Sequence, residues 1–328
     1  MQKIDGDAVW LNWDQLGPTA LEASASLKWQ TKQRFHESNN WKSLLPALAS
    51  YYQQAGCGAF GQYRAFHWKR SPQGGFTEPI AEPDPIRLED LIGCEDQKAW
   101  LIRNTSHFLA GYPSNNIFVY GDRGTGKSSA IKALLNHFSG QPLRMIEISR
   151  DDLVDLPDVM KLVRSRPEYF IVFVDDLSFE EGETEYKTLK AVLEGSLAAR
   201  PSNVLIYASS NRRHLIKEYF SDRNGSESEE VRHQDTLQEK VSLADRFGIQ
   251  LVFVAPGQNE YLAIVRSMAA QRKLTLSEEE LRRQALQWVQ LHNGRSGRTA
   301  RQFVDYLTAE LGTGFSPDRV ASNIHDKS

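Results

Sequence analysis

The stretch Asn116-Ile-Phe-Val-Tyr-Gly-Asp-Arg-Gly-Thr-Gly-Lys-Ser-Ser129 decides the fold, because it joins an apolar strand to a glycine-rich turn and a helix. Within it, Gly121 to Ser128 match the pattern G-x-x-x-x-G-K-[ST] at every fixed position, between a predicted strand and a predicted helix. Glycines let the backbone curl so that successive N–H groups point inward and form a cradle for anions. The stretch therefore predicts a loop that binds the phosphates of a nucleotide.

The side chains of this loop have predicted roles toward a nucleoside triphosphate. Lys127 is expected to reach the β- and γ-phosphates, and the hydroxyl of Ser128 is a suitable ligand for Mg²⁺. The helix that follows adds the positive end of its dipole beneath the phosphates. The residues expected to bind the nucleotide are Gly121, Asp122, Arg123, Gly124, Thr125, Gly126, Lys127, Ser128 and Ser129.

A second candidate element is Tyr169-Phe-Ile-Val-Phe-Val-Asp-Asp-Leu-Ser-Phe-Glu180, an apolar strand that ends in paired carboxylates. Asp175 lies 48 positions after Lys127, and a nucleotide hydrolase needs such carboxylates opposite its phosphate loop. We expect Asp175 to hold Mg²⁺, directly or through water. We expect Asp176 to orient and polarise the attacking water.

The next predicted strand, Asn203-Val-Leu-Ile-Tyr-Ala-Ser-Ser-Asn211, ends in three small polar residues. Ser209, Ser210 or Asn211 could hydrogen-bond the γ-phosphate or the lytic water from this strand end. Asn211 has the side chain and the reach to position a water without being charged. It is therefore the preferred candidate of the three.

Composition limits the classes of protein to consider. The 328 residues are 40% hydrophobic and 25% charged, as in an ordinary globular protein, and the net charge of −3 favours neither nucleic acid nor an acidic membrane. Cys57 and Cys94 lie far apart without metal-ligand spacing, which indicates reduced thiols. Asp5 and Asp7 precede any apolar run, and no stretch reaches about 20 apolar residues. We therefore expect a cytoplasmic protein without a membrane partner.

The chain divides into three predicted regions. Residues 1–80 form an aromatic-rich, mostly helical N-terminal region that holds five of the seven tryptophans, and a Pro/Gly-rich linker follows at 71–85. Tryptophan and tyrosine are frequent anchors of interfaces, so this region could bind a protein partner. The alternative, which we favour, is a small helical module that packs its own aromatics or docks onto the next domain.

Residues 81–256 are expected to form an α/β core and residues 257–328 a helical lid. Apolar strands are predicted at 116–121, 143–148, 169–175, 203–208 and 249–254, with helices at 127–138, 152–165 and 184–199. Short apolar strands that alternate with helices predict a mostly parallel sheet covered on both faces. A polar surface insert is predicted at 222–235.

These residues together resemble an AAA+ ATPase, over about Pro85 to Leu311. The strings Asp175-Asp-Leu-Ser-Phe-Glu180, Ser209-Ser-Asn-Arg-Arg-His-Leu215 and Leu243-Ala-Asp-Arg-Phe-Gly248 are most similar to a bacterial AAA+ family of unknown function. The resemblance implies a P-loop NTPase fold with a three-layer core and a five-stranded parallel sheet in the order 5-1-4-3-2. It also implies ATP and Mg²⁺ as cofactors, bound in the cleft between core and lid.

The resemblance further implies roles for particular polar residues. Asn211 would be sensor 1, and Arg246 the arginine finger that reaches the γ-phosphate bound by a neighbouring subunit. Arg298 would be sensor 2, with Arg301 as the competing choice. Many relatives carry glutamate where this chain has Asp176, so hydrolysis would be slower or would need help from Glu180 or Glu181.

The function that this resemblance implies is ATP hydrolysis by an oligomeric switch or motor, in a hexamer-like ring or open assembly. One alternative is a nucleic-acid-associated ATPase similar to helicase loaders, with a basic patch of Arg212, Arg213, His214 and Lys217. Another is an ATP-dependent binding module with negligible hydrolysis. The segment Ser149-Arg-Asp-Asp-Leu-Val-Asp-Leu-Pro157 lacks the aromatic-apolar-Gly pore loop of AAA+ proteins that thread polypeptides.

Overall fold

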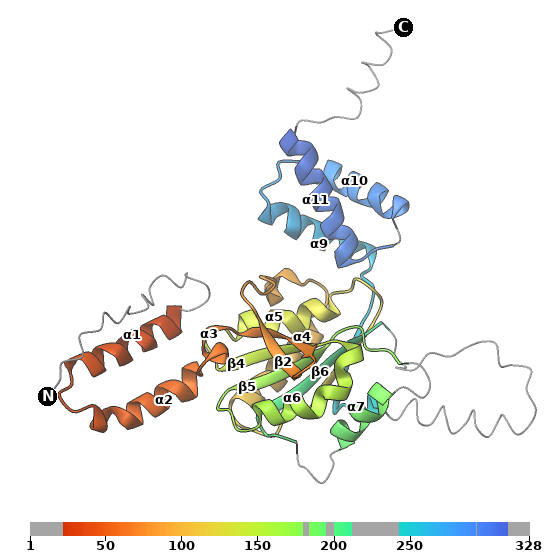
Figure 1. Cartoon of the computed structure of the whole chain (residues 1–328). Coiled ribbons are helices and arrows are strands. Elements are labelled where there is room, and N and C mark those ends of the chain that lie inside the picture. The colour runs from red at the N-terminus through yellow and green to blue at the C-terminus, as the bar shows by residue number, and fades with distance from the viewer. Residues whose placement is uncertain (1–21, 180–183, 195–199, 212–242, 293, 314–328) are drawn as a thin grey trace, which may run out of the picture.

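The computed structural model describes residues 22–179, 184–194, 200–211, 243–292 and 294–313, which form an α/β core, a helical lid and a projecting N-terminal helix pair (Figure 1). The strands are β1 (Ala65–Ser71), β2 (Gly74–Ile80), β3 (Ile117–Gly121), β4 (Leu143–Ile148), β5 (Tyr169–Val174), β6 (Val204–Ser210) and β7 (Ile249–Phe253). The α-helices are α1 (Glu22–Glu37), α2 (Leu45–Ala55), α3 (Ala59–Gln62), α4 (Glu95–Leu109), α5 (Lys127–His137), α6 (Leu156–Val163), α7 (Thr184–Glu194), α9 (Gln258–Gln271), α10 (Glu278–Leu291) and α11 (Gly297–Thr313). Short 3-10 helices are η2 (Trp41–Leu44), η3 (Leu88–Asp90) and η4 (Arg150–Asp155).

The central sheet has seven strands in the order β2-β1-β4-β5-β6-β3-β7. All neighbouring strands are parallel except β1 and β2, which form an antiparallel hairpin. The predicted α/β fold with a mostly parallel sheet is therefore confirmed. The prediction of five strands in the order 5-1-4-3-2 is wrong for the sheet as a whole. Within the observed order the five predicted strands follow one another as β7-β3-β6-β5-β4, and the hairpin extends the sheet beyond β4.

The two additional strands come from residues 65–80, so the prediction of a mostly helical region and a linker is wrong for them. In β1, Phe66 and Trp68 are buried while His67 between them is half exposed, which is the alternation of a strand with one face on the core. Gly75 in β2 leaves room for the Trp68 ring, because a Cβ there would come within 2.0 Å of a ring atom. Glycine usually marks a loop, but here it allows close packing between paired strands.

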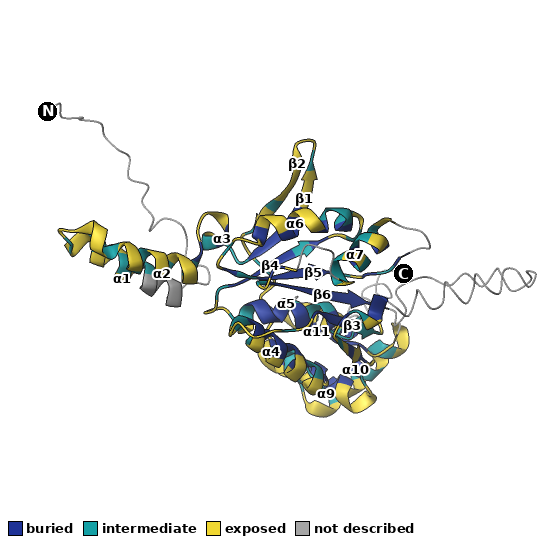
Figure 2. Ribbon diagram, turned by 90° about the horizontal axis from the view of Figure 1, so that it is seen from below, coloured by how far each residue is buried: buried dark blue, intermediate teal, exposed yellow. Residues whose placement is uncertain are grey.

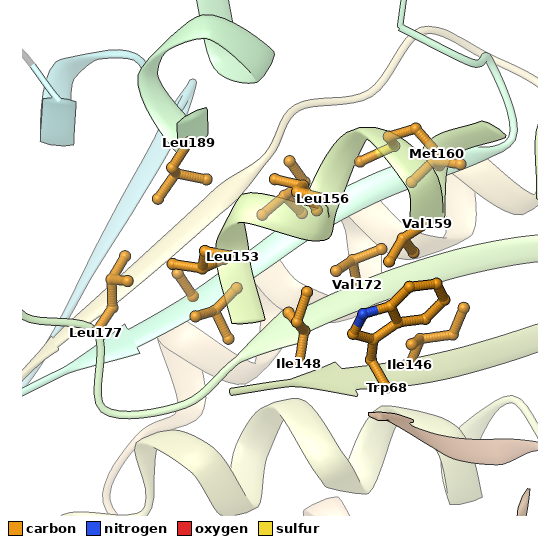
Figure 3. Packing of buried hydrophobic residues seen from close by; sticks show 14 of the residues in the cluster. Trp68, Ile146, Ile148, Leu153, Leu156, Val159, Met160, Val172, Leu177 and Leu189 are labelled. Atoms are coloured by element: carbon orange, nitrogen blue, oxygen red, sulfur yellow. The ribbon is translucent and has the colours of Figure 1, made fainter. Parts of the chain in front are cut away.

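Helices cover both faces of the sheet and bury its central strands β4, β5 and β6, whereas the tip of the β1–β2 hairpin projects and is exposed (Figure 2). Successive residues of β5 alternate between the two layers, as expected of a parallel strand. Val172 packs in the core on the side of α6 and α7, whereas Ile171 and Phe173 pack on the side of α4 and α5. Figure 3 shows Trp68 from the hairpin beside Val159 of α6 in the first of these cores. The hairpin is therefore part of the core.

The lid has a hydrophobic core of its own, formed by α9, α10 and α11. Tyr261, Val265 and Phe303 are among its buried residues. Ser277 is the N-cap of α10, since its side chain accepts a hydrogen bond from the backbone N–H of Glu280 at 3.2 Å. Among the described residues, no helix is both long and apolar enough to cross a bilayer.

Candidate functional site

A cavity of about 730 Å³ lies between the carboxyl ends of the strands and the lid. The core contributes the loop residues Arg123 to Ser129, the strand-end residues Asp175, Asp176, Ser209 and Asn211, and parts of the segment 86–97. The lid contributes Ile264 and Met268 from α9, and Gly297, Arg298 and Arg301 from α11. The structure thus places most of the predicted site residues around one cavity.

The phosphate loop has the backbone that its glycines predict. Gly121, Gly124 and Gly126 have φ angles of 142°, 77° and 96°, which side-chain-bearing residues rarely adopt. Gly126 is the N-cap of α5, so the first N–H groups of this helix face the cavity. The loop therefore supplies an anion-binding helix terminus to the cavity.

Gly121 is required at its position by a close backbone contact as well as by its φ angle. An added Cβ would lie 1.8 Å from the carbonyl oxygen of Phe253 in the neighbouring strand β7. Gly121→Ala is therefore expected to lower the free energy of unfolding by about 2–3 kcal/mol through overpacking and strain.

Urea denaturation measures the effect, and Gly140→Ala is the matched control. No atom lies within 4 Å of a Cβ at Gly140, and its φ angle is not positive. The control is expected to change the free energy of unfolding by less than about 0.5 kcal/mol. Equal stabilities of the two variants would contradict the assigned contact between Gly121 and Phe253.

Lys127 is buried at the start of α5, and its ammonium connects the loop to the end of β6. Its Nζ donates hydrogen bonds to the carbonyl oxygens of Gly121 at 2.9 Å and Asp122 at 2.7 Å, and to Oδ1 of Asn211 at 2.9 Å. Burial lowers the pKa of Lys127, and the nearby carboxylates of Asp176, Asp122 and Asp175 oppose this shift. The ammonium is therefore already placed between the loop and the ends of β5 and β6.

Asp175 and Ser128 meet as the sequence predicts. The hydroxyl of Ser128 donates to Oδ1 of Asp175 at 2.5 Å, and the hydroxyl of Ser209 donates to the same oxygen at 2.5 Å. Mg²⁺ prefers oxygen ligands and is usually held by one or two protein groups together with substrate phosphates and waters. The Ser128 hydroxyl and the Asp175 carboxylate fit this ion, and both face the cavity.

Asp176 adopts a left-handed backbone with a φ angle of 51°. Asp and Asn tolerate this region better than other residues with a side chain, including Glu. This conformation is a physical reason for aspartate, in place of the longer glutamate, at this position. The backbone N–H of Asp176 donates to Oγ of Ser209 at 3.1 Å, and its Oδ1 accepts from Nδ2 of Asn211 at 2.6 Å.

Ser209 and Asn211 thus connect the strand ends to the loop. Ser209 contacts Asp175 through its side chain and holds the backbone of Asp176, while Asn211 bridges Lys127 and Asp176. The sequence offered Ser209, Ser210 and Asn211 as alternatives. Ser210 instead points away, and its hydroxyl donates to the carbonyl oxygen of Leu177 at 2.6 Å. The structure therefore brings both Ser209 and Asn211 into the site.

The lid reaches the phosphate loop directly. A Cβ at Gly124 would lie 2.9 Å from Oγ of Ser296 and 3.3 Å from Cβ of Arg298. Both Arg298 and Arg301 line the cavity, so the two candidates for sensor 2 remain. Sequence reasoning did not name Ile264 and Met268 as site residues. Their spacing of four, which places them on one side of α9, was the available signal.

Arg246 is not brought to this cavity within the single chain. Its guanidinium forms an ion pair with Glu194 at the end of α7, with Nε 2.7 Å from Oε1. Glu180, Glu181, the basic patch at 212–217 and the insert at 222–235 lie outside the described residues. The segment 149–157 contains η4 and the start of α6, with Ser149 as N-cap of η4.

Residues 61–311 match the model of a protein family described as "Protein of unknown function (DUF815)". No curated protein sequence matches the chain. A RuvB mutant from Thermotoga maritima is similar with a TM-score of 0.49 and 16% identity, over 74% of this chain and 72% of that chain. Domain III of the replication initiation protein DnaA from Thermotoga maritima has a TM-score of 0.47 and 20% identity, over 71% of this chain and 92% of that chain. The FIGL-1 AAA domain in complex with ADP has a TM-score of 0.46 and 16% identity, over 72% of this chain and 77% of that chain.

Proposed function

We propose that the chain, which belongs to the DUF815 family and has the AAA+ P-loop fold, binds ATP together with Mg²⁺ and hydrolyses it. The observation that carries this proposal is the convergence of Lys127, Ser128 and Asp175 with Asp176 and Asn211 around one cavity. A phosphate loop alone would support the binding of a nucleotide but not its hydrolysis. The carboxylates opposite the loop support hydrolysis as well.

The cavity offers groups that suit the different parts of ATP. The N–H groups at the start of α5 and Lys127 would bind the phosphates. Apolar side chains from the segment 86–97 and from α9, Leu91 and Ile264 among them, also line the cavity and suit the adenine ring. Mg²⁺ held by Ser128 and Asp175 would neutralise charge on the phosphates.

Asp176 is the residue proposed to act on the attacking water. Its carboxylate accepts a hydrogen bond from Asn211 at 2.6 Å, and this fixes one oxygen while the second remains available. A positioned carboxylate of this kind takes or polarises the proton of the water as the bond to the γ-phosphate forms. Asn211, which also contacts Lys127, keeps the carboxylate and the phosphate-binding ammonium in a fixed relation.

Asp176→Asn is expected to reduce ATP turnover about 100-fold, because the amide cannot accept the proton of the water. Binding of ATP should be retained, since asparagine tolerates the left-handed backbone at this position. Phosphate release over hours and fluorescence titration with an ATP analogue measure the two quantities. Wild-type turnover in the variant would exclude Asp176 as the base, and an inactive wild-type chain that binds ATP would indicate a binding module without hydrolysis.

We also propose that the chain works as a homo-oligomer, with ATP at the boundary of two subunits and Arg246 donated by the neighbour. The support is geometric: Arg246 does not line the cavity of its own chain, although Lys127, Asp176 and Arg298 do. Hydrolysis would then change the position of the lid, which contacts the phosphate loop through Ser296 and Arg298.

A further inference from the structure

A second functional surface lies on the part of the N-terminal helix pair from Lys28 to Ala55, here termed the N-terminal arm. It comprises the end of α1, η2 and α2, and it projects from the core (Figures 1 and 2). Its charge differs from that of the whole chain, which has a net charge of −3. The arm holds four basic residues, Lys28, Lys32, Arg34 and Lys42, but a single acidic residue, Glu37.

The arm also exposes large aromatic rings among these cations. Trp29 is 64% exposed, Trp41 is 67% exposed and Tyr52 is 44% exposed. No residue of α2 or η2 is buried, so these rings do not serve a core within the arm. Trp41 and Tyr52 do contact other aromatics of the region, Phe35 and Tyr51, as the favoured prediction expects, but each keeps an exposed ring surface, as Trp29 does.

Three exposed side chains lie together on the outward side of α1. Trp29, Lys32 and His36 are exposed and follow each other at spacings of three and four, which places them on one side of the helix. Thr31 and Phe35 are half buried on the side that packs against α2. The outward side alternates an aromatic ring with polar and basic groups and carries no continuous apolar stripe.

Trp41 is held in place by its surroundings while its ring stays exposed. Its indole Nε1 donates to the carbonyl oxygen of Phe35 at 3.0 Å, and its ring meets the Phe35 ring edge-on at 6.2 Å between centroids. Asn40 caps η2 by accepting a hydrogen bond from the backbone N–H of Lys42 at 3.2 Å. A fixed, exposed ring next to a lysine loses little entropy when another ring stacks on it.

Buried polar contacts attach the arm to the core at the amino ends of β4 and β5, opposite the nucleotide cavity. Arg144 donates to the carbonyl oxygens of Ala55 at 3.0 Å and Phe60 at 2.5 Å. At Gly56, with a φ angle of 77°, a Cβ would lie 2.4 Å from Oε1 of the buried Glu168. The arm is therefore positioned by the core but leaves the ATP site untouched.

We propose that the N-terminal arm binds single-stranded nucleic acid, with bases stacked on Trp29 and Trp41 and phosphates neutralised by Lys32, Arg34 and Lys42. Base–aromatic stacking combined with a cationic track is the physical basis of binding to unpaired strands. Duplex nucleic acid keeps its bases stacked internally and offers no free base face to these rings. A membrane surface is not favoured, because interfacial helices need a continuous apolar side.

The test uses the full chain without nucleotide and a labelled oligothymidylate of about 20 bases, followed by fluorescence anisotropy. If Lys32, Arg34 and Lys42 contact phosphates, raising the salt concentration fourfold should weaken binding about 20-fold. The double variant Trp29→Ala/Trp41→Ala should weaken binding by more than about tenfold. The control is Trp100→Ala, which removes a ring that is 45% exposed on α4 and should leave binding unchanged.

A second pair of variants tests the charges. Arg34→Glu/Lys42→Glu should abolish binding at moderate salt, whereas Lys161→Glu on the exposed side of α6 should not. The variant Lys127→Met, which is expected to lose ATP turnover, should bind the oligonucleotide as the wild type does. This variant therefore tests oligonucleotide binding separately from ATP hydrolysis. Three results would overturn it: no binding at low salt, equal binding of a duplex, or full competition by polyglutamate without dependence on the tryptophans. Binding to anionic vesicles in place of the oligonucleotide would also overturn it, while oligouridylate extends the test to RNA.

Discussion

Lys127→Met is expected to reduce ATP turnover at least 1,000-fold, to below detection in an ordinary phosphate-release assay. Lys127 is 6% exposed, and its Nζ lies within 2.9 Å of Gly121, Asp122 and Asn211. Methionine fills a similar volume but carries no charge and no donor. The variant therefore removes the cation at the phosphates while keeping the packing at the start of α5.

Affinity for ATP is expected to fall as well, since the ammonium contacts the phosphates before and during the reaction. Lys132→Met is the matched control on the same helix. Lys132 lies 3.4 Å from Glu147 and above the ring of Phe173, on a part of α5 outside the cavity. Turnover by the Lys132 variant should stay within about twofold of wild type. Full turnover by Lys127→Met, with an unchanged circular dichroism spectrum, would exclude the proposed site.

Arg246→Ala is expected to lower turnover about 1,000-fold at saturating ATP while leaving ATP affinity nearly unchanged. An arginine that stabilises charge on the transferring phosphoryl group contributes mainly in the transition state. Within one chain Arg246 forms an ion pair with Glu194 and does not line the cavity. The expected loss therefore depends on an arrangement of two subunits.

Two comparisons separate a role in the neighbouring site from a local structural role. Glu194→Gln removes the same ion pair but keeps the arginine, and it should retain turnover because a surface ion pair contributes about 1 kcal/mol or less. Mixing inactive Lys127→Met chains with inactive Arg246→Ala chains should restore part of the activity. In a mixed oligomer, the Lys127 variant still donates Arg246 to the intact site of its neighbour.

Restored activity requires contact between subunits and should increase with protein concentration. An Arg246→Ala variant with full turnover at every concentration would contradict the assignment. So would equal losses in Arg246→Ala and Glu194→Gln, because the ion pair with Glu194 would then explain the effect. If both single variants behave as expected but their mixture shows no restored turnover, Arg246 acts in the site of its own chain.

The nucleotide-binding part of the site could be predicted because its chemistry is local in sequence. Gly121 to Ser128 form a continuous loop whose glycines specify the backbone and whose Lys127 and Ser128 specify the ligands. Asp175 and Asn211 were predictable because parallel strands end at the same edge of a sheet. The observed hydrogen bonds from Ser128 to Asp175 and from Lys127 to Asn211 agree with that reasoning.

The sequence did not reveal the seven-stranded sheet, because the hairpin at 65–80 depends on contacts between distant residues. Local composition favoured a linker there, whereas the packing of Trp68 over Gly75 and beside Val159 makes it part of the core. Strand propensity depends strongly on such tertiary neighbours. The same limitation hid Ile264 and Met268, which join the cavity only when the lid is placed above the loop.

By itself, the sequence determined the phosphate loop, the acidic strand end, the α/β pattern and the helical character of the lid, since each depends on a short motif or a periodic pattern. Tertiary structure alone decided which polar residue at the end of β6 faces the site and that Asp176 has a left-handed backbone. It also decided that Arg246 lies away from its own cavity and that the tryptophans of the arm are exposed. The physical reason is that burial and side-chain direction depend on residues far apart in the chain, whereas turns and helix caps depend on neighbours in sequence.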